Sequence, residues 1–261
     1  IVAYAQVKQA AARANAEIGV LDAEIADLID RACQDIIEGR LHDQFVVGVI
    51  QGGAGTSSNM NFNEVIANRA LEIAGRPFGD YDYVSPNDHV NRSQSTNDTY
   101  PSAVKLGLVH ATHKLIAEHE FLQYAFKRKG EEFKEVLKVG RTQLQDAVPM
   151  TLGQEFHGFA TTSGEDIERF RDVLPLLLEL NLGATAIGTG INAKPEYGPA
   201  VIRHLRAITG YSELVIARDL IEATSDTGVF MSLSSVMKRA AMKLSKISND
   251  LRLLSSGPQA G

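Results

Sequence analysis

Residues 101–126 read PSAVKLGLVHATHKLIAEHEFLQYAF, and they carry one apolar stripe with the spacing of an α-helix. The members of this stripe are Val104, Leu108, Ala111, Leu115, Leu122 and Phe126. The pattern lasts for about 30 residues, or about 45 Å of helix. A helix of this length exceeds the width of a compact domain, so its stripe has to be buried against other long helices. We therefore expect a helical bundle that is completed by copies of the same chain.

Helical patterns also cover most of the remaining chain. The expected helices run over 3–17, 25–36, 98–126, 149–182, 196–209 and 228–255, with a further helix through 65–73. Pro175 predicts a kink in the helix over 149–182, and residues 139–148 predict a loop between two long helices. Alternating patterns typical of strands are almost absent. The predicted fold class is all-α.

Composition excludes several classes of protein. The 261 residues carry a net charge of −6, and no basic stripe suggests binding to nucleic acid. No apolar run approaches the roughly 18 residues that a membrane helix needs. A single cysteine, Cys33, rules out an internal disulfide framework and favours a reducing, cytoplasmic location. The chain starts within a helical pattern and stops in a loop, so we expect it to be a segment of a longer protein.

Several short motifs do not support a function. Residues 52–55 lack the Gly-Lys-Ser/Thr of a phosphate loop, and residues 183–190 lack the strand that precedes a dinucleotide site. Residues 235–238 have the Ser-x-x-Lys spacing of some hydrolases, but no companion motif accompanies them. His110 and His113 lie one helical turn apart without a converging set of ligands. We predict no metal site.

Four loops rich in hydroxyl and amide side chains lie where predicted helices begin or end. They are residues 55–59 (GTSSN), 93–98 (SQSTND), 140–146 (GRTQLQD) and 188–192 (GTGIN). Hydroxyl groups and the N–H groups of a helix N-terminus are neutral donors suited to a carboxylate or a developing oxyanion. The same residue types also serve simply as helix caps and turns. The loops therefore predict a ligand-binding or catalytic site, but their residue types do not identify the reaction.

Longer stretches around these loops resemble a known family. Residues 52–68, 85–98 and 140–155 are similar to the fumarase/aspartase superfamily, and the resemblance continues in register over 1–261. Within it, the chain resembles the aspartate ammonia-lyase branch, because residues 53–57 (GAGTS) take the aspartase form. Gln143 stands where fumarases carry an active-site histidine, and it is the strongest of the differences from that branch.

The resemblance implies a reaction, which is the reversible elimination of ammonia from L-aspartate to fumarate through an aci-carboxylate intermediate. It implies that hydroxyl groups stabilise the charge on that carboxylate and that two amide side chains hold the departing amino group. The implied hydroxyl residues are Thr56, Ser95, Thr96 and Thr142, and the implied amide residues are Asn97 and Gln143.

The resemblance also implies a catalytic base that residues 1–261 do not contain. The base is expected to be a serine on a glycine-serine-serine loop beyond Gly261, and a further segment is expected before Ile1. The family pattern assigns 1–97 to an N-terminal domain and 98–261 to a central helical bundle. It implies a homotetramer whose active sites are shared between subunits. No organic cofactor is implied, and Mg²⁺ is expected only as an activator.

Two alternatives remain open. A fumarate hydratase would use the same carbanion chemistry with water as the leaving group, and Gln143 argues against it. If these 261 residues were the whole polypeptide, the missing base would leave a helical scaffold without lyase activity. The retained hydroxyl residues argue against a site that has decayed.

Overall fold

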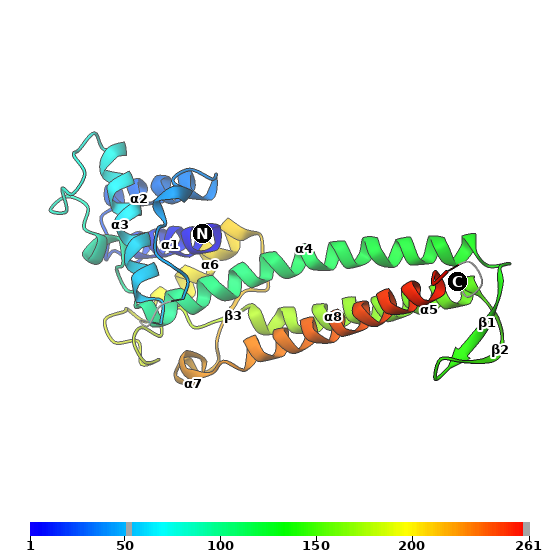
Figure 1. Ribbon diagram of the computed structural model, residues 1–261. Helices are drawn as coiled ribbons and strands as arrows, with labels where there is room; N and C mark the ends of the chain where they lie inside the picture. The colour runs from blue at the N-terminus through cyan, green and yellow to red at the C-terminus, as the bar shows by residue number, and fades with distance from the viewer. Residues whose placement is uncertain (51–53, 258–261) are drawn as a thin grey trace. The chain divides into compact units, whose positions relative to one another are not determined.

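The computed structural model describes residues 1–50 and 54–257, and helices dominate it (Figure 1). The chain divides into two compact units. Unit 1 comprises Ile1–Val109 and Leu176–Asp226, and unit 2 comprises His110–Pro175 and the chain from Thr227 onward. The all-α fold class predicted from the sequence is confirmed, with a few short strands added.

Unit 1 holds most of the shorter elements. Its helices are α1 (Val2–Glu17), α2 (Ala23–Ile37), α3 (Thr56–Ile73), α6 (Tyr197–Thr209), α7 (Leu220–Ser225) and the first part of α4 (Thr96–Glu132). A 3₁₀ turn, η1 (His42–Gln44), and a π-helical turn, η2 (Pro86–Val90), lie between them. Two short parallel strands pair with each other, β3 (Glu179–Leu180) and β4 (Val215–Ile216).

Helix α1 is the centre of unit 1. It packs against α2 and α6, and its buried positions are largely alanines, whose small side chains allow close packing. The predicted stripe of α2 is confirmed, because Ile25, Leu28, Ile29, Ala32 and Ile36 are all buried. Helix α2 begins after Asp22, whose carboxylate accepts a hydrogen bond from Glu24 N at 2.8 Å.

The start of α4 differs slightly from the prediction. The helix begins at Thr96 rather than near Asp98, which places Pro101 in its second turn. Proline has no N–H to donate to the carbonyl of Asn97, four residues earlier. Asn181 supplies the missing donor, since its Nδ2 lies 3.0 Å from Asn97 O. The helix therefore tolerates this proline because a distant side chain donates a hydrogen bond to the carbonyl that the proline leaves without its usual partner.

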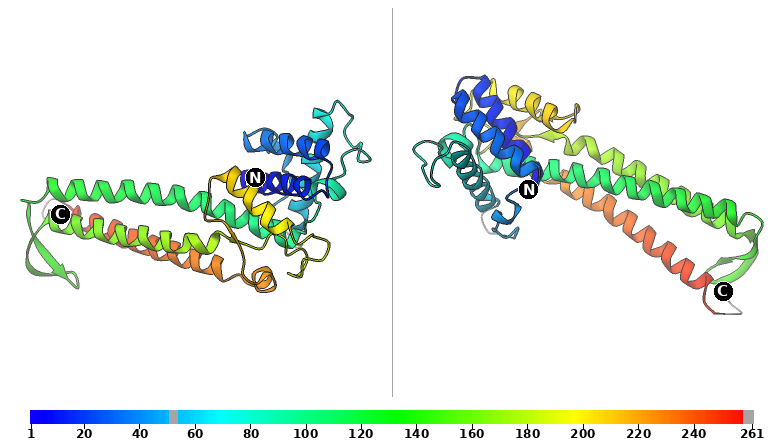
Figure 2. Two further views of the ribbon diagram at one scale, coloured as in Figure 1. Left: turned by 180° about the vertical axis from the view of Figure 1, so that it is seen from behind. Right: turned by 90° about the horizontal axis from the view of Figure 1, so that it is seen from above.

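Unit 2 is built from long helices. It contains the rest of α4, nearly all of α5 (Leu152–Leu177) and α8 (Gly228–Leu254), which run alongside one another in both views of Figure 2. Phe126 of α4, Phe159 and Ala160 of α5, and Ile247 of α8 form a buried cluster. Pro175 lies inside α5, as the sequence predicted.

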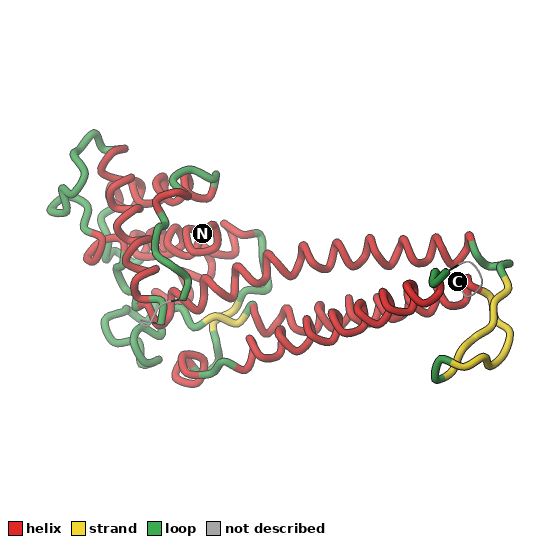
Figure 3. Tube along the Cα trace, viewed as in Figure 1, coloured by secondary structure: helices red, strands yellow, loops and turns green. Residues whose placement is uncertain are grey.

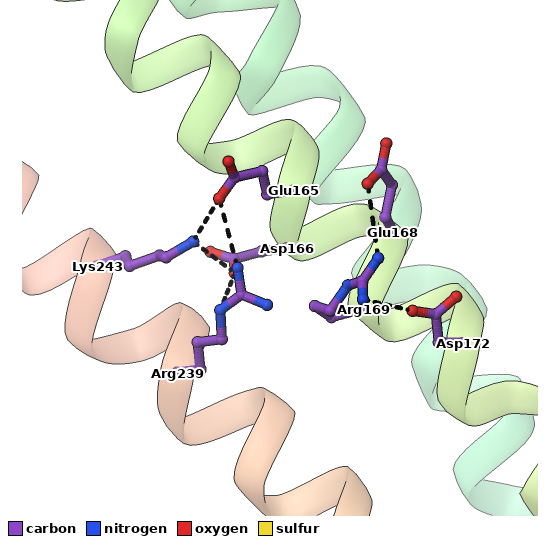
Figure 4. A network of polar contacts seen from close by, with 7 residues as sticks. All are labelled: Glu165, Asp166, Glu168, Arg169, Asp172, Arg239 and Lys243. Atoms are coloured by element: carbon purple, nitrogen blue, oxygen red, sulfur yellow. Dashed lines mark hydrogen bonds and ion pairs between the residues drawn. The ribbon is translucent and has the colours of Figure 1, made fainter.

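Ion pairs join α5 to α8 within unit 2 (Figure 4). The Asp166 carboxylate has only 2% of its side chain exposed, and it lies 3.1 Å from Lys243 Nζ and 3.3 Å from Arg239 Nε. Glu165 contacts the same two cations from a more exposed position. The network ties two helices that are far apart in the sequence.

The prediction of an irregular loop over 139–148 is wrong. The chain forms a β-hairpin there, with β1 (Leu137–Thr142) antiparallel to β2 (Gln145–Thr151), drawn as strands in Figure 3. Pro149 pairs with Val139 in this ladder, so α5 begins at Leu152 rather than at Pro149. The turn has neither the Asn-Gly nor the Gly-Gly that usually marks a hairpin, which is why the sequence did not reveal it.

Two other expectations concern the organisation of the chain. The helices expected over 196–209 and 228–255 correspond closely to α6 and α8. The boundary between two domains after Asn97 stays a prediction, because the division into compact units does not test it. Within the described residues, no helix is long and apolar enough to cross a membrane.

Candidate functional site

A polar pocket of about 660 Å³ lies in unit 1. Three segments form its walls: the turn η2, the residues that precede α4, and the loop before α6. The lining residues are Asn87, Asp88, Asn91, Arg92, Ser93, Gln94, Ser95, Thr185, Ala186, Ile187, Thr189, Ile191 and Asn192. Residues from two of the four loops that the sequence singled out, 93–98 and 188–192, line this pocket.

Ser95 sits at the N-terminus of the longest helix. Its Oγ accepts a hydrogen bond from Asn97 N at 3.2 Å, and its carbonyl accepts from Thr99 N at 3.1 Å. Because Ser95 Oγ acts as an acceptor there, its own proton remains available for donation to a ligand. The first N–H groups and the dipole of α4 favour an anion at this end of the helix.

Asp98 ties two walls of the pocket together. Its Oδ1 accepts from Ser95 N and its Oδ2 accepts from Thr185 N, each at 2.9 Å. The residue is buried, and this burial raises the pKa of Asp98 to about 6, although the backbone N–H groups of Ser95, Thr185 and Gly183 oppose the shift. A carboxylate in this position holds the segment before α4 against the loop before α6.

Asn97 adds a second link between the same segments. Its Nδ2 donates to Ala186 O at 2.7 Å. A carbonyl oxygen only accepts, so this contact fixes which side of the amide carries the nitrogen. The Oδ1 of Asn97 is therefore the side left to accept from a ligand.

Thr96 is held from α3. Asn59, a buried residue of that helix, donates from Nδ2 to Thr96 Oγ1 at 3.1 Å, and its Oδ1 accepts from Tyr4 Oη at 2.8 Å. Since Thr96 Oγ1 accepts in this contact, its hydroxyl proton can be donated elsewhere. Neighbouring donors and acceptors thus fix the orientation of the Thr96 side chain.

Lys8 of α1 holds the segment before α4 in place through two hydrogen bonds. Its side chain is fully buried, and its Nζ donates to Asn91 Oδ1 and to Gln94 Oε1, each at 3.0 Å. Burial lowers the pKa of Lys8 to about 7, although the carboxylate of Asp98 opposes the shift. The two amide oxygens take the place of water around the ammonium group.

Thr56 is the first residue of α3, and its side chain is exposed. The residue before it, Gly55, has a φ of +96°, and a Cβ added there would lie 2.4 Å from the Tyr100 ring. Only glycine therefore lets the start of α3 approach the first turns of α4 this closely. The contact between Asn59 and Thr96 links the same two helices.

Thr142 and Gln143 lie in unit 2, at the tip of the hairpin, and both are exposed. The two central residues of the turn, Gln143 and Leu144, have φ values of 52° and 63°. Non-glycine residues in this conformation carry strain of about 1 kcal/mol or more each. The turn displays the Gln143 side chain on the outside of the hairpin.

The structure thus gathers part of the predicted site. Ser95, Thr96 and Asn97 come together at the start of α4, and a hydrogen bond to α3 connects them with the helix that Thr56 begins. The hairpin residues belong to the other unit. Asp98 and Lys8 were missed as parts of the site, and Lys8 gave no local signal because it is one of several polar residues in α1. No group of three or more His, Cys, Asp or Glu side chains in residues 1–50 and 54–257 is placed to hold a metal ion.

These features define a class of protein: a helical protein that presents hydroxyl and amide groups at the N-terminus of a long helix beside a polar pocket. The chain belongs to the family described as Lyase, whose model matches residues 1–261. It is 59% identical over 262 residues to the aspartate ammonia-lyase of Pseudomonas aeruginosa, and 52% identical over 256 residues to that of Escherichia coli K12. The predicted resemblance to the aspartase branch of the fumarase/aspartase superfamily is confirmed.

Solved structures agree with the family. The fumarate lyase:delta crystallin from Brucella melitensis bound to cobalt superposes with a TM-score of 0.98 at 56% identity, covering 100% of this chain and 56% of that chain. The class II fumarase from Schistosoma mansoni superposes with a TM-score of 0.90 at 33% identity, covering 100% and 57%. The chain covers 55% of the Pseudomonas relative and 53% of the Escherichia relative, so it spans about half their length.

Proposed function

We propose that the whole protein is an aspartate ammonia-lyase that converts L-aspartate reversibly to fumarate and ammonia. The observation that carries this proposal is similarity along the chain: relatives named aspartate ammonia-lyase are 52% to 59% identical over 98% to 100% of it. The pocket at the start of α4 supports the same conclusion, because its donors suit a dicarboxylate.

The hydroxyl groups have the demanding role in this reaction. Removing the proton next to the side-chain carboxylate adds negative charge to that carboxylate, and donors aimed at its oxygens lower the barrier. We assign this role to Thr56, Ser95, Thr96 and Thr142. Ser95 and Thr96 are already held as acceptors by Asn97 N and Asn59 Nδ2, so their protons are available for the substrate.

Two amide side chains are assigned to the leaving amino group. An ammonium group needs acceptors, and the contact with Ala186 O leaves Asn97 Oδ1 as the acceptor of that side chain. Gln143 takes the second position in the proposal. A glutamine there can hold an amino group but cannot activate water as a histidine can, which disfavours a fumarate hydratase.

The remaining parts of the proposal concern groups beyond the pocket. The catalytic base is proposed to be a serine on the loop expected after Gly261, and no base is assigned within residues 1–261. No organic cofactor takes part. Mg²⁺ is proposed as an activator, no chemical step is assigned to it, and assays with and without a chelator would test it. The protein is proposed to work in the cytoplasm, where the single, buried Cys33 would stay reduced.

The proposal includes a homotetramer with active sites shared between subunits. Large apolar side chains on α4 and α8 of unit 2 are exposed in the single chain: Phe121 (70%), Tyr124 (62%), Met231 (68%) and Met242 (64%). Apolar surface of this kind on long helices favours burial against further copies. Light scattering of the whole protein should give the mass of a tetramer.

One comparison of substrates tests the activity. The whole protein should form fumarate from L-aspartate, followed by ultraviolet absorbance, and should release ammonia in equal amount. Under the same conditions it should form little fumarate from L-malate. Preference for L-malate would replace the proposal with a fumarate hydratase, and inactivity on both would contradict either enzyme.

A further inference from the structure

Asp98 makes contacts that a helix cap alone does not explain. Its Oδ1 bonds Ser95 N, three residues earlier, which is the ordinary capping arrangement. Its Oδ2 bonds Thr185 N, which is 87 residues away along the chain. Ser95 and Thr185 both line the 660 Å³ pocket. One buried carboxylate therefore fixes two opposite walls of that pocket.

The backbone of Thr185 adopts a left-handed conformation that is unfavourable for a β-branched residue. Its φ is 57°, in the left-handed region, where a β-branched residue is strained by about 1–3 kcal/mol. Such strain persists only where the surrounding structure holds the residue in place. The hydrogen bond from Thr185 N to Asp98 is the contact of its backbone with the other wall of the pocket.

We propose that Asp98 is a positioning residue, whose two carboxylate oxygens hold residues 93–97 and the loop 183–190 at the spacing that binds a dicarboxylate. This inference rests on the proposed function for the identity of the ligand. Asp98 touches no substrate in this proposal and acts through Ser95 and the loop around Thr185. The bond between Asn97 and Ala186 O runs beside it and depends on the same alignment.

The substitution Asp98→Asn isolates this role. Asparagine has one acceptor oxygen in place of two, and its NH₂ group would face an N–H group that needs an acceptor. One of the two bonds is therefore lost while the shape of the side chain is kept. The loop around Thr185 should relax, and kcat/KM for L-aspartate should fall about 10- to 100-fold because the donors no longer lie in the right place.

Asp22→Asn is the matched control. The Asp22 carboxylate also accepts from two backbone N–H groups, but both belong to the first turn of its own helix. Asparagine is as good an N-cap as aspartate. This variant should leave KM, kcat and amide exchange near the pocket unchanged.

The test measures hydrogen exchange and steady-state kinetics on the whole protein. In Asp98→Asn, the amides of residues 93–97 and 183–190 should exchange faster, and KM for L-aspartate should rise. A variant that merely loses folded molecules would lower kcat and leave KM as it was. The pair Thr185→Gly and Asp98→Asn/Thr185→Gly adds a rescue, because glycine adopts the left-handed conformation without strain. The double variant should therefore have a lower KM than Asp98→Asn, but its KM should stay above that of Thr185→Gly.

Each outcome decides the proposal. Unchanged exchange in Asp98→Asn, or faster exchange with unchanged KM, would overturn the positioning role. If Asp98→Asn did not fold, folding of the double variant with a near-normal KM would also overturn it, because the pocket would then form without the carboxylate. If the unsubstituted protein bound fumarate without turning over L-aspartate, the proposed function would fail, and a weaker fumarate affinity in Asp98→Asn would still support the positioning role.

Discussion

The two units use polar side chains in different ways. In unit 1 the polar groups are buried and join segments far apart in the sequence, as Asp98 does with Thr185 and Lys8 does with Asn91. In unit 2 the network of Figure 4 joins α5 to α8 through one buried carboxylate, Asp166, whereas the side chains around it are partly or largely exposed. Buried polar networks fix geometry, whereas exposed ion pairs add little stability. The comparison indicates that the buried polar groups of unit 1 fix the geometry of its pocket.

The units also differ in how their helices are arranged, although each leaves large apolar side chains exposed, such as Phe78 in unit 1. Unit 1 encloses α1 between other helices of the same chain. Unit 2 has a small buried cluster and leaves residues such as Phe121 and Leu144 largely exposed, at 70% and 74%. The proposed tetramer would bury such exposed apolar side chains. Substitutions of the buried polar groups of unit 1 should therefore change catalysis. In unit 2 the hairpin residues Thr142 and Gln143 should do the same, whereas substitutions on its long helices should change stability or association.

The largest effect is expected from Ser95→Ala. Removing one donor to the developing charge should lower kcat about 100- to 1,000-fold, or about 3–4 kcal/mol. Loss of the cap on Asn97 N should lower the stability by only about 1 kcal/mol. Thr161→Ala is the control, because this exposed hydroxyl on α5 bonds only the carbonyl of His157 in its own helix. A loss of less than tenfold in Ser95→Ala would contradict the assigned role.

The pH dependence of the free energy of unfolding should reveal the raised pKa of Asp98. Burial raises the pKa of Asp98 from 3.8 to about 6, so between these pH values the folded protein holds a proton that the unfolded chain has released. The stabilising contribution of that proton, at most about 3 kcal/mol, is present below pH 4 and is lost as the pH rises to 6. Lys8 and Tyr4 of α1 and Tyr197 of α6 face Asp98, and the pKa values of all three lie above this window.

Melting temperatures of the unsubstituted protein and of Asp98→Asn measure this effect. The difference between the two should shift in favour of Asp98→Asn as the pH rises from 4 to 6, and it should then level off. A difference that stays constant across this range would show that Asp98 has an ordinary pKa.

In unit 2, Asp166→Ala should destabilise the protein by about 2 kcal/mol. The substitution leaves Arg239 and Lys243 without their buried partner, but both cations are partly exposed, which limits the penalty. KM for L-aspartate should not change. Asp172→Ala is the matched control, since its carboxylate is 61% exposed and pairs only with Arg169 in Figure 4. Equal effects of the two variants on the melting temperature would refute the distinction.

Asn181→Ala should have the smallest effect, about 1 kcal/mol of stability. It removes the donor that replaces the missing N–H of Pro101, and it leaves Asn97 O without that partner. Asn249→Ala, at an exposed position of α8, serves as the control for loss of an asparagine. If Pro101→Ala were combined with Asn181→Ala, the alanine N–H should restore part of the loss, because the contacts of Asn181 with Ser102 and Thr224 stay broken. Failure of that rescue would exclude this account of the proline.

Periodicity predicted the helices well, because one apolar stripe is enough to place α2 and α8 within a few residues. It could not predict the hairpin, whose turn uses Gln143 and Leu144 at positive φ in place of the usual asparagine and glycine. Backbone strain at positive φ does not change the spacing of apolar residues, so a hydrophobic pattern cannot reveal it.

The site was predictable only in part. The hydroxyl residues at the start of α4 stood out, because such residues cluster where helices begin. The role of Asp98 could not be inferred, since its second partner, Thr185, is 87 residues away. Lys8 looked like an ordinary residue of an alanine-rich helix, and only the fold shows it buried beneath residues 91–94.

The central claim is that hydroxyl groups of unit 1 and the hairpin of unit 2 meet in one aspartate lyase site, contributed by different copies of the chain. The most direct measurement mixes Ser95→Ala protein with Thr142→Ala protein after dissociation and reassembly. Fumarate formation from L-aspartate should rise well above the sum of the two parents, because some sites regain both hydroxyls. A mixture of Ser95→Ala with Thr96→Ala, both in unit 1, should show no such recovery. Activity no greater than the sum in the first mixture would contradict the claim.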